Sequence, residues 1–574
     1  MSPPSGLRGV ATLFGLLLLA LSFLLPGHYP PWSSFEQQWS AAFGCLLLLA
    51  AWLTTHDDLN WSPLSQLTMA SALLPWGQWL AGQEVYLGDA ALSSLYLLAF
   101  GMCLLAGQYL RDRFDRRFLN WLFTALVVAA SLSVLAALLQ WLHWNTHLLW
   151  VTAVPPTSTP FANLGQRNHL ATLCAMAVAG TLYLQANRAL RLWPTLALLG
   201  WLSVGLILAQ SRTGWFAIAA GGLATLGMRR RLKALPSPQA VGAYLGIVLT
   251  CAALMPSLSQ ALLLSDVQGF SDRLAQETGR LTLWTNLLHA AQLAPWTGYG
   301  FNQIALAQQA ATAVYPTFRM TQDSHNLLVD LIISAGVPFA VLWAAGLLLW
   351  LKNTLKHCNT SPVWWALMAV SAVLIHSLLE FPHSYTYFLL PSGLLMGWLT
   401  SAPDHGRQTF RLVLPVRTTL LAVATIAFCW VTIDYLKIES STRDLRFYLR
   451  RIGPQDVPPA LPDVRLLDMQ REYEWLLLTP ASPGMSASEL VRMKHAAQRF
   501  PYPPALMRYA LAAALNERPE VARTTLINLC GMSVAERCAE ARQAWGEAQA
   551  KWPVLQTVDF PALPWEGRTR SAAP

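Results

Sequence analysis

Four short groups of polar residues border long apolar runs and carry side chains that can do chemistry. They are residues 210–214, 279–280, 323–326 and 376–382. Ionisable side chains beside a membrane are candidates for function wherever they do not simply set the topology of the chain. Each group therefore has a chemical interpretation and a structural alternative.

The first candidate is His325, in the sequence Asp323-Ser324-His325-Asn326 directly before an apolar run. Imidazole titrates near neutral pH, so His325 could accept the proton of an attacking hydroxyl group. Asp323 could orient its ring. The structural alternative is a helix N-cap, because Asp, Ser and Asn all cap helices well and the histidine would then be incidental.

Two arginines, Arg212 and Arg280, suit the binding of phosphate oxygens. Arg212 lies in a tight turn between two apolar runs, and Arg280 opens an amphipathic stretch at 280–294. A guanidinium group can grip phosphate oxygens bidentately, and a helix N-terminus adds to that attraction. The alternatives are an arginine that reaches the lipid headgroups and a solvated surface arginine.

His376 and Glu380 are four residues apart and share a helix face. We interpret this pair as structural, holding neighbouring spans together.

Patterns for nucleotide and metal chemistry are missing from the sequence. It has no glycine-rich phosphate loop or dinucleotide fingerprint, which disfavours an ATP-driven pump. It also has no Cys/His spacing typical of zinc sites, and no acidic cluster in the predicted outer loops that would hold a divalent cation. We predict neither a cofactor nor a metal.

The elements that position these residues are membrane spans. Of the 574 residues 54% are hydrophobic and 12% are charged, whereas soluble domains have about 25% charged residues. Apolar runs near the length needed to cross a bilayer predict an all-α, polytopic protein of about 13 transmembrane helices. The runs are 8–25, 38–54, 64–81, 90–108, 118–142, 169–186, 193–210, 213–228, 240–256, 327–350, 362–380, 384–400 and 418–436. The first run is read as a retained helix, since no small-residue cleavage site precedes Pro26.

The positions of the charges give the orientation. With the N-terminus in the cytoplasm, sixteen Lys and Arg residues from Arg8 to Arg417 fall on the cytoplasmic side, as the positive-inside rule requires. The other side, up to residue 436, has five: Arg167, Arg212, Arg273, Arg280 and Arg319. The net charge of +9 therefore reflects topology, and no nucleic-acid partner is predicted. Topology does not explain Arg212 or Arg280.

The polar regions divide the chain into a transmembrane catalytic domain, 1–436, with a large periplasmic loop at 257–326, and a periplasmic helical domain, 437–574. Helical spacing predicts a helix over 280–294, broken by Pro295, Gly298 and Gly300. The tail is predicted to form short helices near 440–451, 464–478, 486–499, 504–516, 519–530 and 533–550, of tetratricopeptide-like type. A periplasmic tail would permit a disulfide between Cys530 and Cys538.

Six motifs, in order along residues 163–391, resemble those of bacterial O-linking oligosaccharyltransferases of the PglL type, within the O-antigen ligase and polymerase superfamily. They are NLGQRNHLA at 163–171, SRTGW at 211–215, GRLTLW at 279–284, PWTGYGFNQ at 295–303, DSHNLLVDLIISAGVPFA at 323–340 and HSLLEFPHSYTYFLLP at 376–391. The helical tail is also similar. The first 160 residues carry no such signature.

This resemblance implies an inverting, GT-C-like glycosyltransferase of the bacterial inner membrane, active at the periplasmic face. The implied donor is an oligosaccharide on undecaprenyl pyrophosphate, and the acceptor is a Ser or Thr hydroxyl of a periplasmic protein such as a pilin. Arg212 and Arg280 would stabilise the pyrophosphate without a metal, and His325 would be the base. The substrate-positioning residues implied are Gln166, Asn168, His169, Asp323 and Tyr385.

Three other functions stay open at this point. An O-antigen ligase would transfer the glycan to lipid A–core, and a large protein-docking tail is less needed for that reaction. A polymerase is the second possibility. A transporter of lipid-linked glycan would favour polar residues at the middle of the spans, whereas the polar candidates here lie at the outer surface.

Overall fold

The computed structural model describes the chain except for residues 1–5, 55–58, 61, 115, 145–147, 155–157, 263, 265–278, 401–410, 454–456 and 566–574. Arg273 and part of the predicted 257–326 loop lie outside the described residues.

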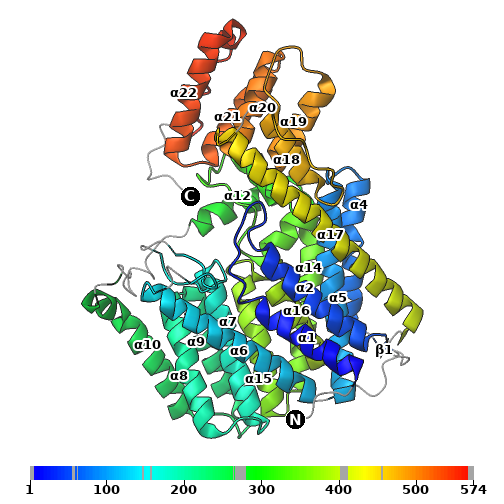
Figure 1. Ribbon diagram of the computed structural model, residues 1–574, viewed down its shortest axis with the longest axis vertical. Helices are drawn as coiled ribbons and strands as arrows, with labels where there is room; N and C mark the ends of the chain where they lie inside the picture. The colour runs from blue at the N-terminus through cyan, green and yellow to red at the C-terminus, as the bar shows by residue number, and fades with distance from the viewer. Residues whose placement is uncertain are drawn as a thin grey trace. The chain divides into compact units, whose positions relative to one another are not determined.

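The described chain is predominantly helical, as predicted (Figure 1). Its first half contains α1 (Leu7–Leu21), α2 (Phe35–Trp52), α3 (Pro63–Ser71), α4 (Leu74–Leu80), α5 (Leu87–Phe114), α6 (Arg116–Trp141), α7 (Arg167–Ala186), α8 (Leu192–Ala209), α9 (Arg212–Met228) and α10 (Pro238–Ala261). Its second half contains α12 (Arg280–Leu293), α13 (Ile304–Ala311), α14 (Leu327–Lys356), α15 (Ser361–Ser377), η1 (Pro382–Ser384), α16 (Thr386–Thr400), α17 (Leu414–Leu449), α18 (Asp468–Leu478), α19 (Ala487–Arg499), α20 (Pro503–Leu515), α21 (Pro519–Gly531), α22 (Ala535–Lys551) and η2 (Pro553–Thr557). Two short strands, β1 (Leu59–Asn60) and β2 (Arg411–Leu412), pair antiparallel, with Leu59 opposite Leu412.

Among the described residues, seven helices are long and apolar enough to cross a membrane, so the chain is a multi-pass membrane protein. They are α5, α6, α7, α8, α10, α14 and α17. The total of thirteen spans stays a prediction, because other expected spans are shorter helices, such as α9 and α16. The expected span at 64–81 is two helices, α3 and α4. Pro75 in the first turn of α4 accounts for this break, because proline has no N–H to donate to the carbonyl group of Ser71 and its ring crowds that carbonyl.

The chain folds into two compact units. The first comprises Met1–Ala70, Tyr96–Gln276 and Ala345–Ala427, and the second Ser71–Leu95, Glu277–Ala344 and Phe428–Pro574. The predicted domain boundary at residue 436 falls inside α17, which continues to Leu449, so the expected helix at 440–451 is the end of α17. The second unit therefore joins the tail to the large loop and to residues 71–95.

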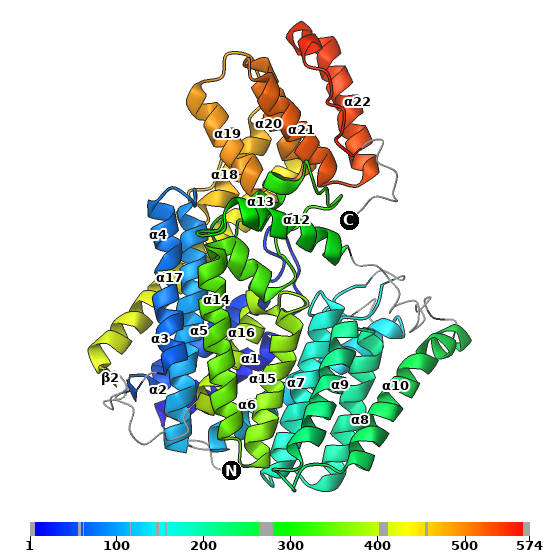
Figure 2. The same cartoon turned by 180° about the vertical axis from the view of Figure 1, so that it is seen from behind.

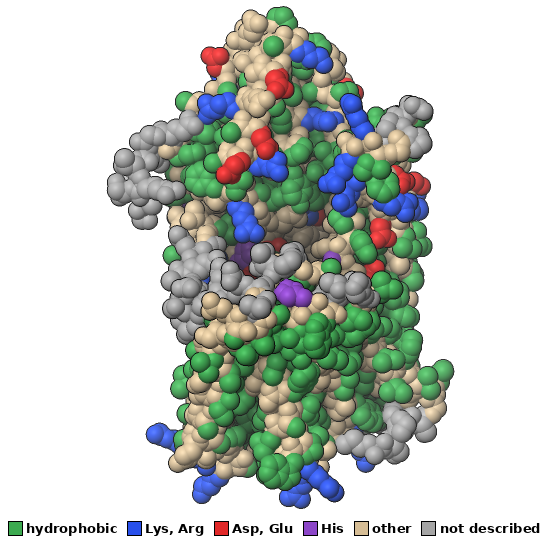
Figure 3. Space-filling model, turned by 60° about the vertical axis from the view of Figure 1, so that its left-hand side comes forward, with side chains coloured by type: hydrophobic (Ala, Val, Ile, Leu, Met, Phe, Trp, Pro, Cys, Tyr) green, Lys and Arg blue, Asp and Glu red, His purple; other side chains and the backbone are tan. Residues whose placement is uncertain are grey.

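In the first unit α7 is a central helix, packed against α6, α8, α9 and α15 (Figure 2). Most of its side chains are buried. Helices α1 and α2 pack where Gly15 and Gly44 face each other. A Cβ on Gly15 would lie 2.7 Å from the Gly44 carbonyl oxygen, so only small residues permit this approach between membrane helices. Figure 3 shows a broad apolar surface on the face that it draws, with Lys and Arg and no Asp or Glu along the lower edge of that surface.

In the second unit the helices of the tail pack in sequence order, α18 on α19, α19 on α20, α20 on α21 and α21 on α22. The predicted tetratricopeptide type is not established by this order. Cys530 and Cys538 form a disulfide between α21 and α22, which confirms the pairing that the sequence permitted.

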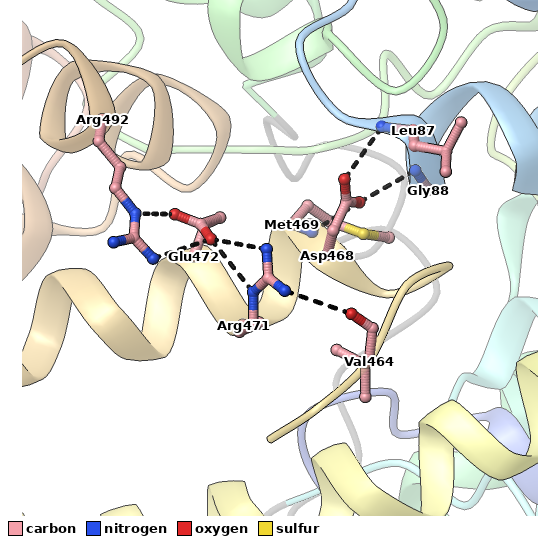
Figure 4. Close-up of polar contacts among 8 residues, drawn as sticks. All are labelled: Leu87, Gly88, Val464, Asp468, Met469, Arg471, Glu472 and Arg492. Atoms are coloured by element: carbon pink, nitrogen blue, oxygen red, sulfur yellow. Dashed lines mark hydrogen bonds and ion pairs between the residues drawn. The ribbon is translucent and has the colours of Figure 1, made fainter. Parts of the chain in front are cut away.

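Two acidic residues attach the tail to the start of α5. The carboxylate of Asp468 accepts hydrogen bonds from the backbone N–H groups of Leu87 and Gly88, at 3.1 and 3.0 Å (Figure 4). A carboxylate at this position stabilises a helix N-terminus. At the next residue, Asp89, Arg499 of α19 forms a buried ion pair at 2.7 and 2.8 Å. Removing one partner of such a pair leaves a buried charge uncompensated.

Candidate functional site

In the first unit, a hydrogen-bonded chain joins three helices through residues of the predicted motifs. Asn168, near the start of α7, donates from Nδ2 to Glu380 Oε1 at 2.8 Å. Its Oδ1 accepts from Ser211 Oγ, also at 2.8 Å. Ser211 in turn accepts the N–H of Gly214 and so caps α9, the helix that Arg212 begins. The side chain of Asn168 thereby connects the turn after α15, which holds Glu380, to the start of α9, where Arg212 lies.

His169 lies in a buried cluster of rings next to this chain. Its Nδ1 is 3.0 Å from the hydroxyl of Tyr387, and its ring lies edge-on to Tyr385 with centroids 4.6 Å apart. Its Nε2 is buried and has no hydrogen-bond partner within the described part of the chain. Thr172, one turn further along α7, hydrogen bonds His376 Nδ1 at 2.7 Å. His376 and Glu380 therefore both bind α7, which agrees with a role in joining spans.

Gln166 occupies the N-cap position of α7 in an extended conformation. Its Oε1 is buried and finds no donor among the residues that the structure describes. A buried amide oxygen without a donor costs free energy that a bound hydroxyl group would recover. This geometry suits the predicted role of Gln166 in positioning a sugar or an acceptor.

In the second unit, Arg280 is the first residue of α12, after Gly279 in the left-handed conformation with φ 66°. The predicted helix at 280–294 is confirmed, with an end one residue earlier. Trp284 follows Arg280 by four residues and so shares its helix face. Its indole Nε1 donates to the carbonyl oxygen of Ser324 at 2.8 Å. This hydrogen bond joins the Arg280 face of α12 to the residue that precedes His325.

The turn around His325 is held by its neighbours. Asn326 Oδ1 accepts the N–H groups of Leu328 and Val329, so Asn326 is the residue that caps α14. Ser324 Oγ donates to the Asn326 carbonyl, and the Ser324 N–H donates to Asp330 Oδ1 at 3.0 Å. His325 itself has φ 59°, a conformation rare outside glycine that persists only where the surroundings impose it.

The structure thus brings the predicted residues together in two groups. Within the first unit they are Gln166, Asn168, His169, Arg212 and Tyr385, and within the second they are Arg280, Asp323 and His325. For Asp323, the contacts described are those of its backbone with Thr321, so its role in orienting the His325 ring stays a prediction. Within the described ranges, no group of three His, Cys, Asp or Glu residues could hold a metal ion.

Three residues that organise these groups were missed by sequence reasoning. Asn163 binds the carbonyl groups of Leu24 and Trp150 through its side chain, and His28 binds the Asn163 carbonyl at 3.0 Å. Trp284 is the third. Asn163 and Trp284 both lie in the quoted motifs, but the motif letters do not distinguish a scaffold residue from a reacting one. His28 carries no such signal.

A multi-pass helical membrane protein with polar residues gathered at helix ends is the class that this fold and these groups define. Comparison with known families gives three matches along the chain. The family described as protein glycosylation ligase matches residues 160–184, O-antigen ligase matches 197–344, and the C-terminal part of virulence factor membrane-bound polymerase matches 363–553.

Two curated proteins of Acinetobacter baylyi are similar in sequence. A general O-oligosaccharyltransferase is 28% identical over 536 residues, which cover 91% of this chain and 92% of the relative. A ComP-specific O-oligosaccharyltransferase is 23% identical over 399 residues, 69% of this chain and 72% of the relative. These matches confirm the predicted resemblance to the superfamily and the prediction that the chain is a glycosyltransferase.

Proposed function

We propose that this enzyme transfers an oligosaccharide as one unit from undecaprenyl pyrophosphate to Ser or Thr hydroxyl groups of periplasmic proteins, such as a pilin. Two proteins of similar sequence are named O-oligosaccharyltransferases, and one of them is named ComP-specific. These names support a protein acceptor over lipid A–core. The match to an O-antigen ligase family keeps the ligase as the second candidate.

The observation that carries the proposal is that Arg212 and Arg280 each begin a helix, α9 and α12. The first N–H groups of a helix have no partner within it, and together with the helix dipole they attract anions. Each arginine therefore adds a bidentate cation to a backbone already suited to phosphate. Neither position is explained by the positive-inside rule, because both lie on the side that is poor in Lys and Arg.

The reaction needs charge stabilisation on one side and a base on the other. The acceptor hydroxyl oxygen attacks the anomeric carbon from the face opposite the pyrophosphate, and the new C–O bond forms with inversion. The bond from the anomeric carbon to the pyrophosphate oxygen breaks, and undecaprenyl pyrophosphate leaves with the electron pair. In this proposal the two guanidinium groups stabilise that charge without a metal, and His325 takes the hydroxyl proton.

Two features support a periplasmic location for the reaction and for the tail. Disulfides persist in oxidising compartments such as the periplasm, and Cys530 and Cys538 are joined. The clustered charges Arg229, Arg230, Arg231 and Lys233 anchor the opposite end of α9 in the cytoplasm under the positive-inside rule. This orientation places Arg212, at the other end of α9, on the outer side.

The test uses a host that assembles a lipid-linked glycan but lacks its own ligase and O-linking transferase. The wild type, His325→Ala and His289→Ala are each expressed with a periplasmic pilin-like acceptor. His289 is a matched control, a histidine of the same loop whose ring packs on Tyr315. The acceptor mass and the lipopolysaccharide bands are measured together.

We expect a glycan-sized increase in acceptor mass with the wild type and with His289→Ala, and none with His325→Ala. Glycan on lipid A–core in place of the protein would identify a ligase. Retained activity in His325→Ala would refute the role of this histidine as base. No transfer by the wild type to either acceptor, with the protein present in the membrane, would contradict the transferase proposal.

A further inference from the structure

The large loop contains an uncharged stretch that is unusual for a segment in water. Between Arg280 and Arg319 there is no Asp, Glu, Lys or Arg in residues 281–318. A soluble sequence of this length would contain roughly nine charged residues at the usual proportion of about 25%. The stretch includes α12 and α13, which are amphipathic helices and not spans of their own.

The exposed face of α12 carries large apolar side chains beside polar ones. Its inner face, with Leu283, Leu287 and Ala290, packs against α13 and the first turns of α14 in one core. Its other face exposes Leu281 and Leu288 together with Thr285 and Gln292. The following turn exposes two more large apolar side chains, Leu293 at 61% and Trp296 at 77%. A group of large apolar side chains exposed together normally marks a surface that a partner or a membrane covers.

The turn after α12 is paired with a break in a membrane-spanning helix. α14 is interrupted at Gly336, which has φ 84°. The N–H of Tyr299 donates to the Ile333 carbonyl at 2.7 Å, and the N–H of Val337 donates to the Pro295 carbonyl at 2.8 Å. A Cβ at Gly336 would lie 2.3 Å from the Trp296 carbonyl oxygen, so the two backbones are in direct contact.

A side chain from α4 also binds α14 next to this break. Gln78 Nε2 donates to the Ser334 carbonyl at 2.9 Å, a group that has no helical donor because residue 338 is a proline. Backbone groups at membrane depth must be satisfied by the protein itself, because lipid provides no donors. These hydrogen bonds meet this requirement for α14, and they fix the position of the 293–300 turn along α14.

That position lies inside the apolar part of the span. The uncharged run of α14 covers residues 331–351, which is 21 residues, close to the roughly 20 that cross a bilayer. The paired residues 333–337 are two to six residues inside the end of this run, or about 3–9 Å at 1.5 Å per residue. Amphipathic segments that lie in a membrane interface bury their apolar face to about 5–10 Å.

We propose that the exposed face of α12 and the turn at 293–300 bind phospholipid in the leaflet at which α14 begins. The occupant is lipid because this surface continues along α14 itself, where Val341 is 62% exposed in a helix that crosses the bilayer. Tryptophan is enriched at this depth. The large loop is then seated in the membrane along α12, and the Trp284 bond holds the His325 turn at the level of the lipid headgroups.

The experiment replaces Leu293 or Trp296, one at a time, by the photo-crosslinking residue p-benzoylphenylalanine in the full chain. Val341, exposed on the span, is the positive control, and Val554, 46% exposed in the tail, is the negative control. Cells are grown with radioactive glycerol, which enters phospholipid and not the undecaprenyl phosphates, in a host that lacks the glycan donor, so that a labelled lipid is phospholipid. Membranes are irradiated, and the denatured chain is purified and counted. The residues replaced are exposed, so the substitution displaces no packed side chain.

We expect irradiation-dependent label at positions 293 and 296 that is comparable with Val341 and well above Val554. Label at both positions no higher than at Val554, with Val341 labelled, would place this face in water and overturn the proposal. A protein cross-link of higher mass in place of lipid label would also overturn it. The result is independent of glycan transfer, because the host contains no donor.

Discussion

Arg212 and Arg280 are expected to contribute to transfer through charge and geometry together. Because each begins a helix, replacement by alanine leaves the backbone N–H groups but removes the bidentate cation. Loss of one such stabilising group typically lowers kcat by about 100-fold or more. We predict losses of this size for Arg212→Ala and Arg280→Ala, with partial recovery by lysine, which restores charge but not the planar geometry.

The measurement is turnover with a defined lipid-linked donor and a peptide acceptor in detergent. Arg319→Ala is the matched control, since Arg319 is an exposed arginine of the same loop that the proposal does not use. Full activity in both the Arg212→Ala and Arg280→Ala variants would refute pyrophosphate binding by these residues.

Glu84 makes the stability of the second unit depend on pH. Burial raises the pKa of Glu84 to about 8. The Phe301 N–H, whose nitrogen lies 2.6 Å from Glu84 Oε1, lowers the pKa, and the charge of Asp89 raises it. Between its ordinary pKa of 4.5 and 8, the unfolded chain releases this proton while the folded chain keeps it. Stability therefore falls as pH rises through this range.

We predict that Glu84→Gln removes this part of the pH dependence. Between pH 5 and pH 9, a span of about 4 pH units, the melting temperature of the wild type should fall by more than that of the variant. The check is the melting temperature of the purified protein in detergent at both pH values. Glu536→Gln, at an exposed position of α22, is the control and should follow the wild type. Equal loss in the wild type and Glu84→Gln would show that Glu84 is ionised in the folded protein.

At the scale of elements, one side chain couples two of them, since the Trp284 indole of α12 binds the Ser324 carbonyl before α14. Phenylalanine would retain the ring but lose the donor. A hydrogen bond contributes about 1 kcal/mol net, so Trp284→Phe should reduce kcat about fivefold and leave KM for the acceptor little changed. Trp193→Phe, at an exposed position on α8, is the control. An unaltered kcat in Trp284→Phe would show that Trp284 acts through packing alone.

Local elements were predictable from the sequence, and the contacts between them were not. Helical spacing and Pro295 gave α12 to within one residue, because both signals are local. The hydrogen bond between Asn168 and Glu380 joins residues 212 positions apart. The periodicity of a sequence carries no information about contacts between residues so far apart. The pairing of the 293–300 turn with α14 was missed for the same reason. Gly336 marks the break in α14, but the carbonyl group of Trp296 that packs against it belongs to another segment.

At the scale of the whole molecule, the placement of charge predicts a single orientation. Lys and Arg are retained preferentially on the cytoplasmic side during insertion, and the cluster at 229–233 is the densest such signal between two spans. Alkaline phosphatase, which needs an oxidising compartment to form its disulfides, should therefore be active when fused after residue 558 and inactive when fused after residue 234. Green fluorescent protein fused at the same two positions should report the reverse. Phosphatase activity at residue 234 but not at 558 would invert the topology, and would leave the Cys530–Cys538 disulfide in a reducing compartment where it could not persist.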